Sequence, residues 1–140
     1  MAKNIYTTHS SEETKKLAVE LATSVKGGEF IALVGDLGAG KTTFVQGLAA
    51  ALGSSAKVKS PTFTLMNVYP TAHPTIKQIV HVDFYRVPNA SVDLALAEYC
   101  RNDTIIVAEW PGKTELKKRS LMISFALGAS MNERTIKIER

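Results

Sequence analysis

The chain has 140 residues, 45% of them hydrophobic and 21% charged, which is typical of one globular domain spanning residues 1–140. Its net charge of +4 arises within residues 112–140, because positive and negative side chains cancel in residues 1–111, and so modest an excess favours a solvated surface over a nucleic-acid-binding one. The single cysteine excludes an internal disulfide, and no apolar run approaches the ~20 residues of a membrane span, so we expect a soluble cytoplasmic protein.

Residues 10–53 predict a helix, a buried strand and a second helix. Ser10 and Glu13 have the spacing of a helix-capping box. Apolar residues then recur at helical spacing, and Gly27-Gly28 is expected to end the helix: Leu17, Ala18, Leu21, Ala22 and Val25. The apolar run 30–34 predicts a strand buried on both faces. A second helix is predicted from Lys41 to about Leu52, where Gly53 ends it.

The rest of the chain predicts further strands and one short helix. Residues 63–69 and 78–84 are expected to pair as a hairpin, and residues 91–100 to form a helix in which Cys100 is buried. Residues 104–108 predict a second buried strand, and residues 121–127 and 134–139 two closing strands. This order predicts an α/β fold, a P-loop NTPase-like three-layer sandwich whose parallel core sheet carries antiparallel additions.

A phosphate-binding motif lies between the first buried strand and the second helix. Residues 35–42 match G-x-x-x-x-G-K-[ST] at every fixed position. Glycines let backbone N–H groups converge on phosphate oxygens, and the start of the helix adds its positive dipole end. Lys41 is expected to reach the β- and γ-phosphates and Thr42 to bind Mg²⁺. The expected nucleotide-binding residues are Asp36, Leu37, Gly38, Ala39, Gly40, Lys41, Thr42 and Thr43.

Two carboxylates end predicted strands and are candidates to hold Mg²⁺ or its water. Asp83 follows residues 79–82, and Glu109 follows residues 104–108. Strand ends on one side of a parallel sheet border the ligand crevice, so either can reach the metal. Asp36, inside the motif, is a candidate to orient water or to hold the shape of the loop. The residues leave the choice between Asp83 and Glu109 open.

Three further residue groups are candidates for parts of the site. Ser60, Thr62 and Thr64 surround Pro61 in a segment that resembles a switch loop closing on a γ-phosphate, although turn chemistry explains them equally well. Trp110 follows Glu109 and is either a core anchor or an aromatic side chain near the nucleotide. We interpret His81, between Val80 and Val82, as a core or supporting histidine rather than a catalytic base.

Four sequence blocks occur together along nearly the whole chain: residues 35–43, 60–65, 81–86 and Glu109-Trp110-Pro111. In order and spacing they resemble the TsaE family, small bacterial P-loop ATPases required to make threonylcarbamoyladenosine (t6A) at position 37 of tRNA. The resemblance implies an ATPase that acts with the TsaD and TsaB proteins. No arginine finger stands out in the sequence, although Arg86 could act in cis, so we expect the ATPase to be slow in isolation. The basic C-terminal end suggests at most indirect or weak contact with tRNA.

The resemblance also implies roles for individual residues. Lys41 and Asp83 match catalytic positions, Thr42 and Glu109 the magnesium ligands, and Thr62 with Thr64 the switch-like loop. The family's adenine pocket corresponds to the segment near Ser10 and to the basic C-terminal end, where Arg134 is the matching residue.

Two other functions remain compatible with the P-loop. A small-molecule kinase would need an acceptor pocket and an arginine-rich lid, for which 140 residues leave little room. A GTP-gated binding switch would suit the segment 60–64, but the sequence contains no Asn-Lys-x-Asp stretch to recognise guanine. The motifs therefore favour ATP as the nucleotide.

Overall fold

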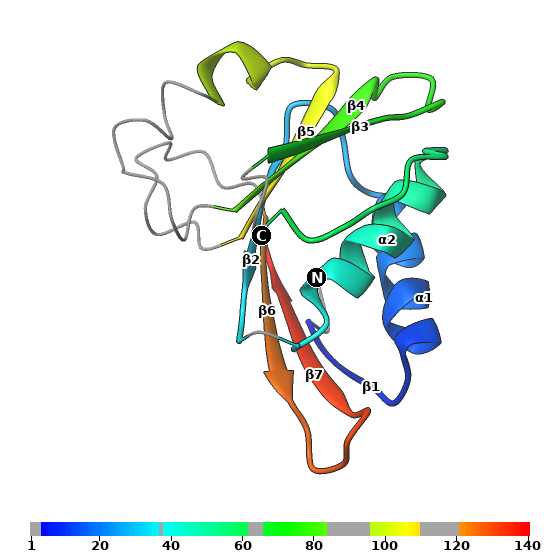
Figure 1. Cartoon of the computed structure of the whole chain (residues 1–140), viewed down its shortest axis with the longest axis vertical. Coiled ribbons are helices and arrows are strands. Elements are labelled where there is room, and N and C mark those ends of the chain that lie inside the picture. Colours follow the sequence, from blue (N-terminus) through cyan, green and yellow to red (C-terminus); the bar gives the residue numbers. More distant parts are fainter. Residues whose placement is uncertain (1–3, 37, 62–65, 84–95, 110–120) are drawn as a thin grey trace.

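The computed structural model describes residues 4–36, 38–61, 66–83, 96–109 and 121–140. In these ranges the chain forms a seven-stranded sheet with two α-helices and one 3₁₀ helix (Figure 1): β1 (Ile5–Thr8), α1 (Ser11–Ala22), β2 (Phe30–Val34), α2 (Lys41–Ala51), β3 (Met66–Pro70), β4 (Gln78–Asp83), η1 (Ala97–Tyr99), β5 (Thr104–Glu109), β6 (Leu121–Leu127) and β7 (Arg134–Glu139). None of the helices in these ranges has the length and apolar character to cross a membrane.

The sheet has the predicted parallel core with antiparallel additions. The strand order is β1-β7-β6-β2-β5-β4-β3, in which β6, β2, β5 and β4 run parallel. Strand β3 adds antiparallel to β4, which confirms the predicted hairpin, although residues 63–65 of the predicted strand lie outside the described residues. Strands β7 and β1 extend the other side antiparallel. The α/β fold class is confirmed.

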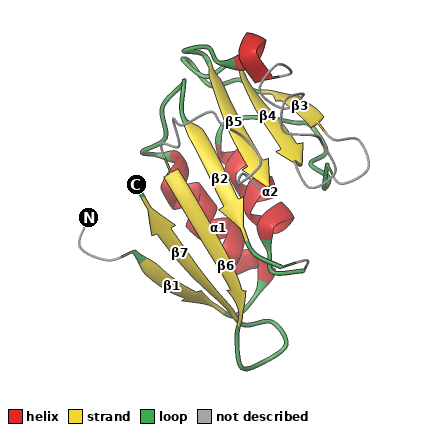
Figure 2. Cartoon of the chain, turned by 90° about the vertical axis from the view of Figure 1, so that its left-hand side faces the viewer, coloured by secondary structure: helices red, strands yellow, loops and turns green. Residues whose placement is uncertain are grey.

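Strand β2 is buried on both faces, as its continuous apolar run predicts. Ile31 and Leu33 pack into the core that holds α1 and α2, and Phe30 and Ala32 pack on the opposite face with Leu96. Both α-helices lie on the same face of the sheet (Figure 2). Side chains alternate between the two faces along each strand, and this alternation decides which strand-end residues can reach the loop before α2.

The predicted helix over residues 91–100 lies partly outside the described residues, and its described part is only the single turn η1. Cys100, which we predicted to be buried, is exposed, so that prediction was wrong. The physical reason is local. Cys100 directly follows η1 as its C-cap, and a single turn at the surface does not present the continuous apolar face that would cover the thiol.

Helix α1 begins as predicted but ends earlier. The Ser10 hydroxyl accepts a hydrogen bond from the Glu13 N–H at 3.1 Å, the predicted cap. At the other end, the hydroxyls of Thr23 and Ser24 donate to carbonyls of the last turn at 2.8 and 3.0 Å and end the helix at Ala22. Gly27 therefore does not stop the helix; a Cβ there would overlap the carbonyl oxygen of Asn102, so glycine permits a close backbone approach instead.

Strand β1 was not predicted. It is a four-residue edge strand that pairs only with β7, whose residues lie about 130 positions further along the chain. Its alternation is too short to register as a strand pattern in the sequence alone. The pairing places Thr8 opposite Arg134 and thereby brings the start of α1 close to the start of β7.

Helices α1 and α2 are in close contact at Gly47, and Gly47→Ala is expected to destabilise the fold. A Cβ there would lie 2.7 Å from the Lys15 carbonyl oxygen and 3.1 Å from the Ala18 Cβ. Helix propensity favours alanine by about 1 kcal/mol, but overpacking against rigid backbone costs about 1–3 kcal/mol, so we expect a net loss. Urea denaturation measures the change in the free energy of unfolding. Ala50→Gly, at an exposed position of α2, is the control for the effect of helix propensity alone. A variant as stable as the parent would contradict the tight crossing.

Candidate functional site

The residues of the predicted P-loop connect β2 to α2. Gly40 precedes α2 with a φ of 102°, a left-handed conformation that glycine adopts without strain. Because Gly40 has no side chain to cap the helix, the positive end of α2 is left to face a cavity lined by Lys41, Thr42 and Thr43. Gly35 has a φ of 151°, and a Cβ there would lie 2.6 Å from the Phe125 carbonyl oxygen. Glycine is therefore required where the loop leaves the sheet.

The cavity has a volume of about 340 Å³ and is walled by segments far apart in the sequence. They are the start of α1, the P-loop with the first turn of α2, the segment at Ser60, the end of β5 and the turn leading into β7. The residues that line it are Ser10, Ser11, Glu12, Thr14, Gly38, Gly40, Lys41, Thr42, Thr43, Ser60, Glu109, Asn132 and Arg134. Nine of these are residues that the sequence nominated: Ser10, Gly38, Gly40, Lys41, Thr42, Thr43, Ser60, Glu109 and Arg134.

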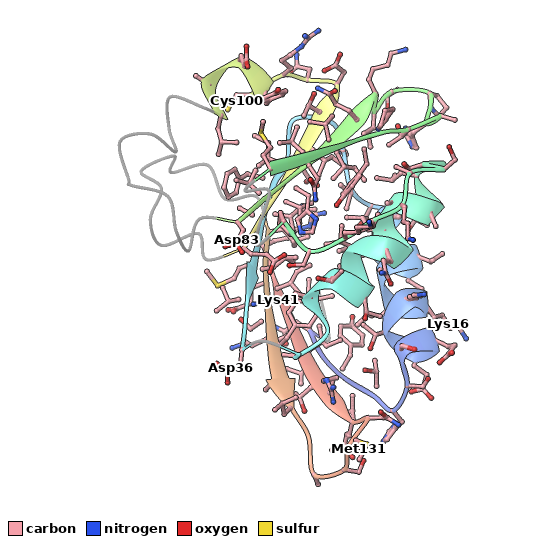
Figure 3. The ribbon with its side chains drawn as sticks, viewed as in Figure 1. Lys16, Asp36, Lys41, Asp83, Cys100 and Met131 are labelled. Atoms are coloured by element: carbon pink, nitrogen blue, oxygen red, sulfur yellow. The ribbon has the colours of Figure 1, made fainter. Side chains whose placement is uncertain are left out.

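Other nominated residues lie elsewhere. Among the described residues, the cavity lining does not include Asp36, whose side chain is exposed (Figure 3) and whose carbonyl accepts a hydrogen bond from the Ala39 N–H at 3.1 Å. Ala39 is packed into the core. Asp83 is buried one strand further from the P-loop, paired in register with Glu109. Four nominated residues lie outside the described residues: Leu37, Thr62, Thr64 and Trp110.

Lys41 and Glu109 form a buried ion pair at the floor of the cavity. The Lys41 Nζ donates to the Gly35 carbonyl at 2.5 Å and lies 3.7 Å from Glu109 Oε1. Both side chains are only 5% exposed. Glu109 reaches this position because β5 lies beside β2, with Leu33 and Glu109 paired in register. A buried charge needs a partner to offset its desolvation, and here each side chain supplies it for the other.

Glu109 has a second buried partner. Its Oε2 lies 2.8 Å from His81 Nε2, and the other ring nitrogen of His81 lies 3.1 Å from the Tyr69 hydroxyl. The Tyr69 hydroxyl in turn donates to the Lys59 carbonyl at 3.0 Å, directly before Ser60 on the cavity wall. The interpretation of His81 as a supporting residue agrees with this position. Tyr69 was not nominated, because its contact with His81 depends on the register of β3 against β4.

Comparison with known proteins identifies the family. The family model described as "Threonylcarbamoyl adenosine biosynthesis protein TsaE" matches residues 8–136. The chain belongs to the TsaE family.

Individual relatives agree with this assignment. The TsaE protein of Bacillus subtilis is 42% identical over 103 residues, which cover 74% of this chain and 63% of that protein. The TsaE protein of Aquifex aeolicus is 47% identical over 103 residues, covering 72% and 71% of the two chains. The crystal structure of YdiB from Bacillus subtilis superposes with a TM-score of 0.75 at 32% identity, covering 99% of this chain and 86% of that one. The matched region is thus less than two thirds of the length of the first of these relatives.

Sequence reasoning missed four residues of the cavity in this TsaE-family chain: Ser11, Glu12, Thr14 and Asn132. Three of them lie in the first turn of α1, next to the nominated Ser10, so their proximity to a cap residue was the available signal. The Glu12 carboxylate accepts hydrogen bonds from its own backbone N–H and from the Ser11 hydroxyl, and these bonds hold the pKa of Glu12 below its ordinary value. Thr14 joins its hydroxyl to that of Thr8 at 2.8 Å and so fixes α1 against β1.

Arg134 connects the cavity wall to the P-loop, and Arg134→Ala is expected to weaken nucleotide binding. Its guanidinium donates to the Gly38 carbonyl at 3.0 Å and to the Met131 and Glu133 carbonyls, both at 2.9 Å. Loss of these bonds and of a positive charge on the cavity wall should cost about 1–2 kcal/mol, or about 5- to 30-fold in Kd. Titration calorimetry measures the change. The matched control is Arg140→Ala, because Arg140 pairs with Glu29. Equal effects of the two variants would contradict the role of Arg134.

Proposed function

We propose that this chain binds ATP with Mg²⁺ in the cavity, hydrolyses the nucleotide, and thereby supports t6A formation at position 37 of tRNA in the cytoplasm, together with TsaD and TsaB proteins. The observation that carries the proposal is the convergence of Lys41, Thr42 and Glu109 on one cavity at the start of α2. The t6A role is supported by membership of the TsaE family and by the names of the relatives.

The residues of the cavity fit a magnesium–nucleotide complex. Thr42 and Glu109 line the same cavity, and their side chains carry the hard hydroxyl and carboxylate oxygens that Mg²⁺ takes as ligands in nucleotide sites. When bound, Mg²⁺ neutralises charge on the β- and γ-phosphates. We assign Glu109 rather than Asp83 as the metal-side carboxylate, because Glu109 lines the cavity and contacts Lys41.

The chain's own residues would contribute positioning and charge stabilisation. Hydrolysis consists of attack by water on the γ-phosphorus and cleavage of its bond to the β-phosphate oxygen, with ADP as the leaving group. The N-terminus of α2 and the Lys41 ammonium would stabilise negative charge on the transferred phosphoryl group. Asp83 does not line the cavity, and we assign it an indirect catalytic role through Glu109, its partner in register on the neighbouring strand. The position of Ser10 and Arg134 on the opposite wall suits contacts with the nucleoside.

Reconstitution tests the proposal directly. TsaD and TsaB proteins of the same organism would be incubated with unmodified tRNA, the threonylcarbamoyl donor and ATP, with and without this chain. We expect the chain to raise the number of t6A molecules formed per TsaD well above one, and a non-hydrolysable ATP analogue to remove that gain. Undiminished multiple turnover without the chain would overturn the proposed role.

Nucleotide preference provides an independent test. We expect ATP with Mg²⁺ to raise the Tm of the chain more than GTP does at the same concentration, because ligand stabilisation grows with the ratio of concentration to Kd. At an ATP concentration of 100 times Kd, binding stabilises the fold by about 2.7 kcal/mol, which raises the Tm of a domain of this size by several degrees. A thermal-shift assay with both nucleotides measures the difference. Stronger stabilisation by GTP would favour the nucleotide-gated switch instead.

A further inference from the structure

A continuous row of buried polar side chains crosses three neighbouring strands beneath the cavity. From β5 to β3 it consists of Glu109, His81 and Tyr69, joined at 2.8 and 3.1 Å. His81 is fully buried, Tyr69 is 3% exposed and Glu109 4%. Strand register explains the alignment. His81 is paired with Val107 on β5, two residues before Glu109, and with Asn67 on β3, two residues before Tyr69. Two residues along a strand is one repeat of the pleat, so all three side chains face α2.

The two oxygens of Glu109 have different partners. Oε2 lies against His81, whereas Oε1 is the oxygen directed toward Lys41, 3.7 Å away, and Lys41 lines the cavity. An ionised carboxylate only accepts hydrogen bonds, so the His81 Nε2 must donate. The opposite ring nitrogen of His81 lies 3.1 Å from the Tyr69 hydroxyl. Contacts at both nitrogens therefore hold the ring in this orientation.

The far end of the row is anchored on backbone. The Tyr69 hydroxyl lies 3.0 Å from the Lys59 carbonyl and 3.4 Å from the Lys59 N–H. Lys59 precedes Ser60, which lines the cavity. The row therefore starts at Glu109 on the cavity wall and ends on the backbone next to Ser60, another residue of that wall. Neither ring can rotate without losing a buried hydrogen bond.

We propose that His81, backed by Tyr69, is a positioning residue that holds the Glu109 carboxylate with Oε1 turned toward the cavity. The inference rests on the proposed magnesium–nucleotide function of that cavity. Neither His81 nor Tyr69 lines the cavity among the described residues, so both act through Glu109. Without the His81 donor, Glu109 is free to rotate and to close on Lys41, which withdraws its oxygen from the metal side. Partners of this kind, bonded to a metal-binding side chain, typically change metal affinity about 10- to 100-fold when removed.

The experiment measures ATP binding by calorimetry twice, once with Mg²⁺ and once with EDTA, in the full chain and its variants. His81→Leu should lower the gain in ATP affinity due to Mg²⁺ by about 10- to 100-fold. Affinity in EDTA should stay within about twofold, because the P-loop itself is unchanged. His81→Gln should recover most of the gain, since its amide nitrogen can donate to Glu109. His73→Gln, in the turn between β3 and β4, is the matched control and should have no effect.

Tyr69→Phe keeps the inference testable if His81→Leu does not fold. This substitution removes one hydroxyl and no carbon atom, and it should reduce the gain in ATP affinity due to Mg²⁺ several-fold. An unchanged gain in folded His81→Leu, or in Tyr69→Phe when His81→Leu is unfolded, would overturn the inference. So would equal losses in Mg²⁺ and in EDTA, which indicate general damage. Failure of the parent chain to bind ATP with Mg²⁺ would instead overturn the proposed function, so the two failures are distinguishable.

Discussion

Replacement of Lys41 by alanine is expected to reduce ATP hydrolysis to background, a loss of at least about 100-fold. The Lys41 ammonium is the positive charge held at the floor of the cavity, with its position fixed by the Gly35 carbonyl and by Glu109. Removal of one preorganised donor from a charge-stabilising site typically costs about 100- to 1,000-fold in kcat. The effect here should be at the upper end, because the substitution also leaves the buried Glu109 carboxylate without its cationic partner. Release of phosphate under saturating ATP and Mg²⁺ measures it.

The control for this variant is Lys16→Ala on the exposed face of α1 (Figure 3). Both substitutions remove one positive charge, but only Lys41 lines the cavity, so Lys16→Ala should retain full activity. Lys41→Met guards against misfolding, since methionine keeps the apolar stem of the side chain and removes only the ammonium. Undiminished hydrolysis in folded Lys41→Met would contradict the assignment of the P-loop.

Much of the fold could be predicted because its central elements carry local signals. The runs in β2 and β5 are apolar without interruption, which strands buried on both faces require, and Gly53 marks the end of α2. The parts that were wrong or missed depend on tertiary contacts. Gly27 resembles a helix stop in the sequence, but its role is set by Asn102, which lies 75 positions later. Strand β1 exists because β7 offers it an edge.

The residues of the candidate site likewise divide into those that a local sequence pattern predicts and those that only tertiary contacts bring together. The P-loop is contiguous, so its pattern was sufficient to nominate Lys41 and Thr42. The opposite wall is assembled by the pairing of β1 with β7, and no periodicity within one segment indicates that Thr14 and Asn132 line one cavity. The two strand-end carboxylates could be nominated but not ranked from sequence. Ranking them required the strand order, which places β5, and not β4, beside the strand that leads into the P-loop.

Because of that strand order, we expect Glu109 to contribute to Mg²⁺-dependent ATP binding and Asp83 to contribute only to turnover. The variants Glu109→Gln and Asp83→Asn test this difference. Glu109→Gln should abolish most of the gain in ATP affinity due to Mg²⁺ and lower kcat about 100-fold or more, because a neutral amide is a poor ligand for Mg²⁺. Gln still offers an oxygen to the His81 donor at the position of Oε2, so the buried row keeps its hydrogen bonds and the fold should persist.

Asp83→Asn should leave the Mg²⁺-dependent affinity within about threefold of the parent and lower kcat, because Asp83 does not line the cavity and is assigned an indirect role in turnover through Glu109. Calorimetry with Mg²⁺ and with EDTA, followed by steady-state kinetics, separates binding from turnover. Exposed Glu20→Gln is the matched control for charge loss. The reverse pattern, with magnesium dependence lost in Asp83→Asn and kept in Glu109→Gln, would mean that the nucleotide complex draws its metal ligand from β4. The carboxylate nearest to Lys41 would then serve to balance the lysine charge.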